Sequence, residues 1–142
     1  MFLNQLGEKE KELFLSLCAY AAMADGEFEF DEMESIAVYC HEMMMPNHLP
    51  DTSEPLETVL DNIVKLASPQ EKNIVVLELL LMFKKEGNYK EVEKKFMDTV
   101  VNRLAVTAEK YEEISDLTDE YLHICHRVCQ AIEKMPTAVP ST

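Results

Sequence analysis

The sequence predicts an all-α fold, a compact bundle of six to seven helices built from two pseudo-symmetric halves with two central buried helices. Composition is the first reason, because the 142 residues include only three glycines and many Leu, Met, Glu and Lys residues, which favour helix. The second reason is that residues 13–24 and 74–83 are apolar on nearly every side, so their helices must be central. The third is that these two stretches resemble one another, together with the residues directly after each. No stretch predicts a strand.

The first half of the chain predicts three helices. Residues 8–24 form a buried helix, and Gly26 is placed to end it with a left-handed cap. An amphipathic helix over residues 30–44 comes next, and it stops before the proline-rich loop that opens at Pro46. A third helix is predicted over residues 54–66, where Leu, Val and Ile recur on one face.

The second half begins with a strong helix-start signal. Ser68 is placed to cap a helix over residues 69–85, with Pro69 in its first turn and Glu71 three residues after the cap. A glycine at position 87 ends this helix in the way that Gly26 ends the first one.

The remaining residues predict two or three more helices. One helix covers residues 89–104, and Thr107 caps the next. The motif "SDLTDE", residues 115–120, is expected to break that segment before a last helix that ends near Met135. We expect residues 136–142 to be a disordered tail and residues 1–135 to form one domain.

An internal repeat relates residues 8–45 to residues 69–105. A shift of 61 residues places Gly26 on Gly87, and it brings apolar and acidic residues of the two segments into register. Each half then consists of a buried helix, a turn with an acidic residue and glycine, and an amphipathic helix.

The charge distribution restricts the partners. The net charge of −14 disfavours nucleic acid or an anionic membrane as a partner, because association would add repulsion between like charges. Residues 12–64 contain acidic side chains and no Lys or Arg, whereas residues 84–95 are rich in lysine. We interpret the acidic run as a solvated helix face, with a binding surface as the alternative.

The cysteines and the apolar runs bear on the cellular compartment. The four cysteines lie among apolar residues without a signal peptide pattern ahead of them, which favours reduced thiols in a cytoplasmic protein. No apolar run reaches the roughly 20 residues that span a bilayer, so we expect no integral membrane protein.

The stretch "ADGEFEFDEME", residues 24–34, with its later echo "LMFKKEGNYKEVE", resembles the TerB-like, or tellurite-resistance-protein-like, superfamily. The resemblance covers roughly residues 6–115. It implies a small, non-enzymatic, acidic bacterial domain that acts in stress response and binds a divalent metal such as calcium, magnesium or manganese. The metal ligands that the resemblance implies are Asp25, Glu27, Glu32, Glu86 and Glu93.

The second half departs from the family pattern. Where Asp-Gly-Glu is expected, the chain has Glu86, Gly87 and Asn88, and several lysines surround them. A second metal site is therefore in doubt, although both halves can still supply ligands to one ion. The alternative for the first turn is that its carboxylates only complement the positive N-terminus of the next helix. The turn is not an EF-hand, because glycine is second after Asp25 and Ile36 stands where a bidentate Glu is required.

Three other features have competing interpretations. In "HICHRVC", residues 123–129, we expect Cys125 and Cys129 to be buried, reduced and free of metal on a core stripe. Glu78 is expected at a helix edge facing a lysine or water, with a buried carboxyl of raised pKa as the alternative. The methionines at 43–45 are expected to close the core, with a flexible partner-binding patch or a soft-metal site as the alternatives.

No nucleophile, phosphate-cradle or dinucleotide motif is present, so we expect no enzyme. Two functions remain. One is a non-catalytic domain that binds a divalent cation in bacterial stress response. The other is a metal-free protein interaction module whose acidic half binds a basic protein or another copy of the chain.

Overall fold

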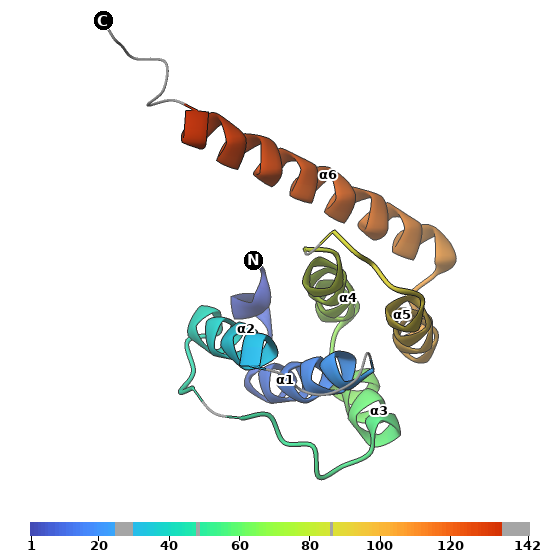
Figure 1. The fold of residues 1–142 in the computed structure, drawn as a ribbon. Helices are drawn as coiled ribbons and strands as arrows, with labels where there is room; N and C mark the ends of the chain where they lie inside the picture. The colour runs from blue at the N-terminus through green and yellow to red at the C-terminus, as the bar shows by residue number, and fades with distance from the viewer. Residues whose placement is uncertain (25–29, 48, 86, 135–142) are drawn as a thin grey trace, which may run out of the picture.

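A computed structural model describes residues 1–24, 30–47, 49–85 and 87–134, and these residues contain only helices, turns and loops (Figure 1). The all-α prediction is therefore confirmed for this part of the chain. The elements are η1 (Leu3–Gln5), α1 (Glu8–Met23), α2 (Phe30–Glu42), α3 (Leu56–Leu66), α4 (Pro69–Lys84), α5 (Glu91–Arg103) and α6 (Ala108–Lys134).

The two apolar helices lie in the core, as predicted. Every side chain from Leu13 to Ala22 on α1 is buried or half-buried, and α4 buries residues on most of its circumference. The two helices contact each other, but α1 packs most extensively against α3, and α4 packs most extensively against α6. The polar Ser16 in the buried part of α1 donates its hydroxyl to the carbonyl of Asp51 at 2.7 Å, which fixes the proline-rich loop against α1.

The start of α4 has the predicted capping box. The Glu71 N–H donates to Ser68 Oγ at 3.1 Å, and the Ser68 N–H donates to Glu71 Oε1 at 2.9 Å. The second Glu71 oxygen accepts the N–H of Gly7 at 3.0 Å, so the same carboxylate also holds the start of α1. The bond from the Ser68 backbone is the largest cause that lowers the pKa of Glu71.

The predicted glycine after α4 is confirmed. Gly87 has φ of +78°, and its N–H donates to the Lys84 carbonyl at 2.9 Å. A side chain is rarely stable in this left-handed conformation, and this explains glycine here. Gly26, the corresponding residue of the first half, lies outside the described residues, so the internal repeat stays a prediction.

The methionine cluster does not close the core as a whole. Met43 is fully buried, but Met44 has φ of +59° and is 87% exposed. The Met45 N–H donates to the Cys40 carbonyl at 3.0 Å, which is the hydrogen bond of a left-handed cap. Because this cap turns the chain sharply after Glu42, Met44 points to solvent.

The predicted break at "SDLTDE" is wrong, because α6 is one helix of 27 residues. Thr107 caps it as predicted, accepting the Lys110 N–H at 3.1 Å. Within the motif, Thr118 is fully buried and donates to the Ser115 carbonyl at 2.6 Å. Lys84 of α4 donates to Ser115 and Thr118, so the polar groups that favour a break are satisfied by tertiary contacts.

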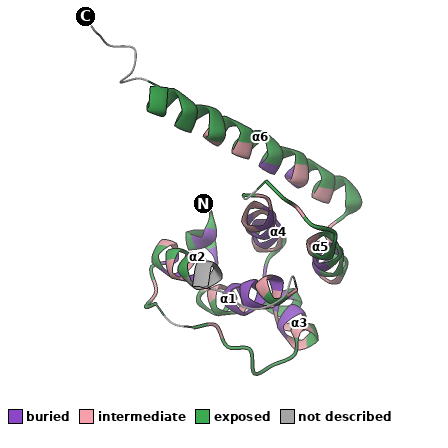
Figure 2. Ribbon diagram, in the orientation of Figure 1, coloured by how far each residue is buried: buried purple, intermediate pink, exposed green. Residues whose placement is uncertain are grey.

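Burial along α6 changes with distance from the bundle (Figure 2). The first half has buried and half-buried residues on the side that faces α4, whereas every residue from His126 to Lys134 is exposed. None of the described helices, α6 included, combines the length and the apolar character needed to cross a membrane. Residues 135–142, the expected disordered tail, lie outside the described residues.

Candidate functional site

The predicted metal ligands fall largely outside the described residues. This holds for Asp25, Glu27 and Glu86, and for the side chain of Glu32, although its backbone belongs to α2. Glu93 is described, and its Oε1 accepts the Lys90 N–H at 2.8 Å at the start of α5. Within the described ranges no group of three acidic, His or Cys side chains is placed to hold a metal ion. The metal site therefore stays a prediction, and Glu93 acts as a helix cap.

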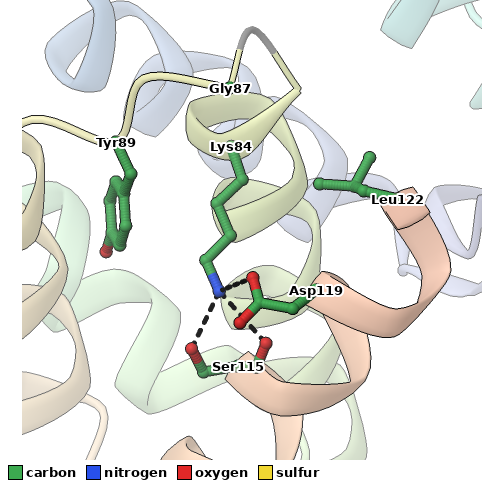
Figure 3. A pocket seen from close by; sticks show the side chains of 6 residues that line it. All are labelled: Lys84, Gly87, Tyr89, Ser115, Asp119 and Leu122. Atoms are coloured by element: carbon green, nitrogen blue, oxygen red, sulfur yellow. Dashed lines mark hydrogen bonds and ion pairs between the residues drawn. The ribbon is translucent and has the colours of Figure 1, made fainter. Parts of the chain in front are cut away.

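A pocket of about 390 Å³ lies between the end of α4, the following loop and α6 (Figure 3). Lys84 reaches into it from α4, and its ammonium group donates to the Ser115 carbonyl at 3.0 Å, Ser115 Oγ at 2.8 Å and Thr118 Oγ1 at 2.9 Å. The Asp119 carboxylate completes the set at 3.0 Å. The Lys84 side chain is 9% exposed, and the three donors of its ammonium group are engaged by these oxygens. Lys84 is therefore suited to joining α4 to α6 and poorly suited to binding an anion.

Tyr89 forms another wall of the pocket. Its ring stacks on Phe83 at 6.2 Å between centroids, and the ammonium groups of Lys84 and Lys94 each lie 5.6 Å from its centroid. The hydroxyl is buried without a hydrogen-bond partner in the described part of the chain. Burial, with the neighbouring Tyr111, raises the pKa of Tyr89, so the hydroxyl stays protonated and is no nucleophile near neutral pH.

Two carboxylates, the buried Glu78 of α4 and the half-buried Glu42 of α2, hold the beginning of the chain. Glu78 Oε2 accepts the Phe2 N–H at 2.7 Å, and Glu42 Oε2 accepts the Leu3 N–H at 3.0 Å. The amino group of Met1 lies 2.9 Å from Glu78 Oε2. The prediction that Glu78 faces a lysine or water is wrong, because Glu78 is buried and its partners are the Phe2 N–H and the Met1 amino group, directly before η1. The role of this pair is structural.

The described cysteines divide into two classes. Cys18 and Cys40 are buried in the core, and burial raises the pKa of Cys18 well above its usual value. The prediction that Cys125 and Cys129 are buried is wrong, because Cys125 is half-buried and Cys129 is exposed. Their apolar stripe is real, but α6 extends past α4, so no other described element covers its later turns.

The feature that the sequence interpretation missed is an exposed apolar face of α6. Five large apolar side chains on this helix are 43–62% exposed. They are Leu117, Tyr121, Ile124, Val128 and Ile132, and we call them the α6 apolar face. Their spacing of three or four residues was visible in the sequence. The same spacing is also typical of a buried stripe that faces the core, so only the structure shows that this face is exposed.

No family model matches the chain, and comparisons with curated proteins and with solved structures give no match either. The resemblance to the TerB-like superfamily accordingly remains a prediction from the sequence.

Proposed function

We propose that this chain is a non-catalytic protein interaction module that binds its partner on the α6 apolar face. The observation that carries the proposal is the exposure of five large apolar side chains on one face of one helix. Single exposed apolar residues are ordinary on a protein surface, but a contiguous row of them is typical of an interaction site.

The stability of α6 supports the same conclusion. Its residues from His126 to Lys134 are all exposed, so packing within the described chain does not stabilise them. In proteins, most of the stability of a helix comes from the packing of its amphipathic face. A partner that covers the apolar face would supply the missing burial.

The polar clusters of the described residues support structural roles. Lys84 joins α4 to α6, Glu71 caps α4 and Glu78 holds the Phe2 backbone. Cation binding at Asp25 and Glu27, and a role in stress response, rest on the resemblance alone and stay a separate proposal.

The test is site-specific photo-crosslinking in cells that express the chain. A photo-reactive residue replaces Ile124 on the apolar face or, as the matched control, the exposed Gln130 on the opposite face of α6. We expect discrete protein adducts from position 124 and none from position 130. The absence of adducts at 124, or equal adducts at both positions, would contradict the proposal.

A further inference from the structure

We infer that the partner on the α6 apolar face is a second copy of this chain, and that the two α6 helices pack antiparallel in a homodimer. This inference rests on the proposed function and adds the identity of the partner.

The spacing of the apolar face matches a two-helix seam. Leu117, Tyr121, Ile124 and Val128 are separated by four, three and four residues, which is the alternation of the a and d positions of a heptad. Ile132 follows Val128 by four residues and so lies beside the next d position, and the four residues in register span about 16 Å at 1.5 Å per residue. Another helix with the same spacing is the surface that fits such a seam.

The face is also free of the contact with α4. The buried residues Ile114 and Thr118 lie on the α4 side of α6. With 3.6 residues per turn, the centre of the apolar face lies roughly a quarter-turn around the helix from that side. The helix can therefore pack on α4 and on a second helix at the same time.

The charge of α6 is divided between its halves, and this favours an antiparallel pair. The acidic side chains of the first half are Glu109, Glu112, Glu113, Asp116, Asp119 and Glu120. The second half has Arg127 and Lys134 as its basic residues and Glu133 as its acidic one. A parallel pair would place two acidic halves side by side, whereas an antiparallel pair places each acidic half beside the opposite, more basic half.

One register brings specific charges together. Glu120 and Arg127 are exposed, occupy the same flank of the seam one heptad apart, and make no ion pair with a described residue. If a two-fold axis crosses α6 between His123 and Ile124, Glu120 of each copy lies opposite Arg127 of the other copy. In the same register Leu117 packs near Val128 of the second copy, and Tyr121 packs near its Ile124. Equivalent flanking positions face each other in an antiparallel pair, and they do not in a parallel pair.

The size of the seam sets the expected strength. The surface area that one pair of short helices buries is at the low end of the areas of specific protein interfaces. The net charge of −14 on each copy adds repulsion. We therefore expect a reversible dimer with a dissociation constant on the order of micromolar.

Sedimentation equilibrium over a concentration series, with reducing agent present, tests the inference. We expect Ile124→Asp to weaken the dimer by about a hundredfold, since it places a charge in the seam. Arg127→Glu and Glu120→Arg should each weaken it by about tenfold, and the double swap Glu120→Arg with Arg127→Glu should restore it. Glu112→Arg and Gln130→Asp, which lie on the opposite face, are the charge-matched controls and should not disrupt the dimer.

Three outcomes would overturn the inference. A chain that is monomeric at its highest soluble concentration excludes a second copy. A dimer that is indifferent to Ile124→Asp lies on another surface. A dimer that is indifferent to both single charge substitutions lacks the antiparallel register. If the chain is monomeric but position 124 crosslinks to a different protein, the proposed function stands and only this inference fails. An intramolecular crosslink from position 124 to residues 135–142 contradicts both.

Discussion

Cys18 shows how one buried residue affects the pH dependence of the whole protein. Its thiol is 1% exposed on α1, and burial is the largest cause of its raised pKa, followed by the nearby Glu78 and Cys40. In the unfolded chain the thiol has its ordinary pKa of 9.0, so the unfolded state loses this proton first as the pH rises. Stability is therefore constant below pH 9 with respect to this group and falls above it.

We predict that the free energy of unfolding falls above pH 9 by up to about 1.4 kcal/mol per pH unit from Cys18 alone. Tyr39, whose pKa is also raised mainly by burial, adds to the decline above pH 10. Urea denaturation across pH 7 to about 10 measures this. The variant Cys18→Ala should lower stability at pH 7 and also reduce the alkaline slope. An unchanged slope in Cys18→Ala would show that Cys18 does not cause the decline.

At the scale of elements, one polar side chain crosses the contact between α4 and α6. Lys84 crosses from α4 to satisfy Ser115 and Thr118, and its ion pair with Asp119 lies at the edge of the pocket. This bond set explains why α6 is continuous through a motif rich in polar residues.

We predict that Lys84→Met destabilises the fold by about 1 to 3 kcal/mol, because Met keeps most of the apolar stem and leaves Thr118 and Ser115 without their donor. Urea denaturation measures the change. Asp119→Asn should cost less than about 1 kcal/mol, because the Asp119 side chain is 64% exposed and the amide oxygen of Asn still accepts from Lys84. Equal losses for the two substitutions would mean that the ion pair, and not the buried hydroxyl contacts, joins the helices.

At the scale of the whole molecule, the excess of acidic groups opposes the compact state. The net charge is −14, and the acidic stretch at residues 25–34 contributes a large part of it. Monovalent salt screens such repulsion over about 8 Å at physiological ionic strength, whereas a bound divalent cation removes it locally. The two effects are separable by experiment.

We predict that calcium, magnesium or manganese raises the melting temperature more than sodium chloride does at equal ionic strength. A metal ion at a free concentration of about 100 times its dissociation constant adds about 2.7 kcal/mol to the free energy of unfolding. The variant Asp25→Asn with Glu32→Gln should respond to divalent and monovalent salt alike. Glu71→Ala is the control, because it removes the bond to the Ser68 N–H at the start of α4 and should lower the melting temperature without changing the metal response. If the melting temperatures of the native chain and of the double variant respond identically to divalent salt, the metal acts only by screening the charges and no cation site exists at Asp25 and Glu32.

The sequence by itself determined the local structure of this protein. The capping box at Ser68, the left-handed Gly87, the Thr107 cap and the burial of α1 all depend on residues close together in the chain. A helix that is apolar around its whole circumference is stable in water only when other elements cover it on all sides, so such a helix is central in any packing arrangement. These features could therefore be predicted without knowing the packing.

Only the tertiary structure decided what each amphipathic face contacts. The stripe of Cys125 and Cys129 has the periodicity of a core face, yet α6 extends beyond α4 and leaves its last turns exposed. Glu78 has the pattern of a polar edge of α4, yet it is buried because the Phe2 backbone N–H, 76 positions away, reaches it. Periodicity fixes which residues share a face but carries no information on the distant segment that covers it. For that reason the candidate interaction surface was visible in the sequence only as a pattern, and its exposure came from the packing of α6 on α4.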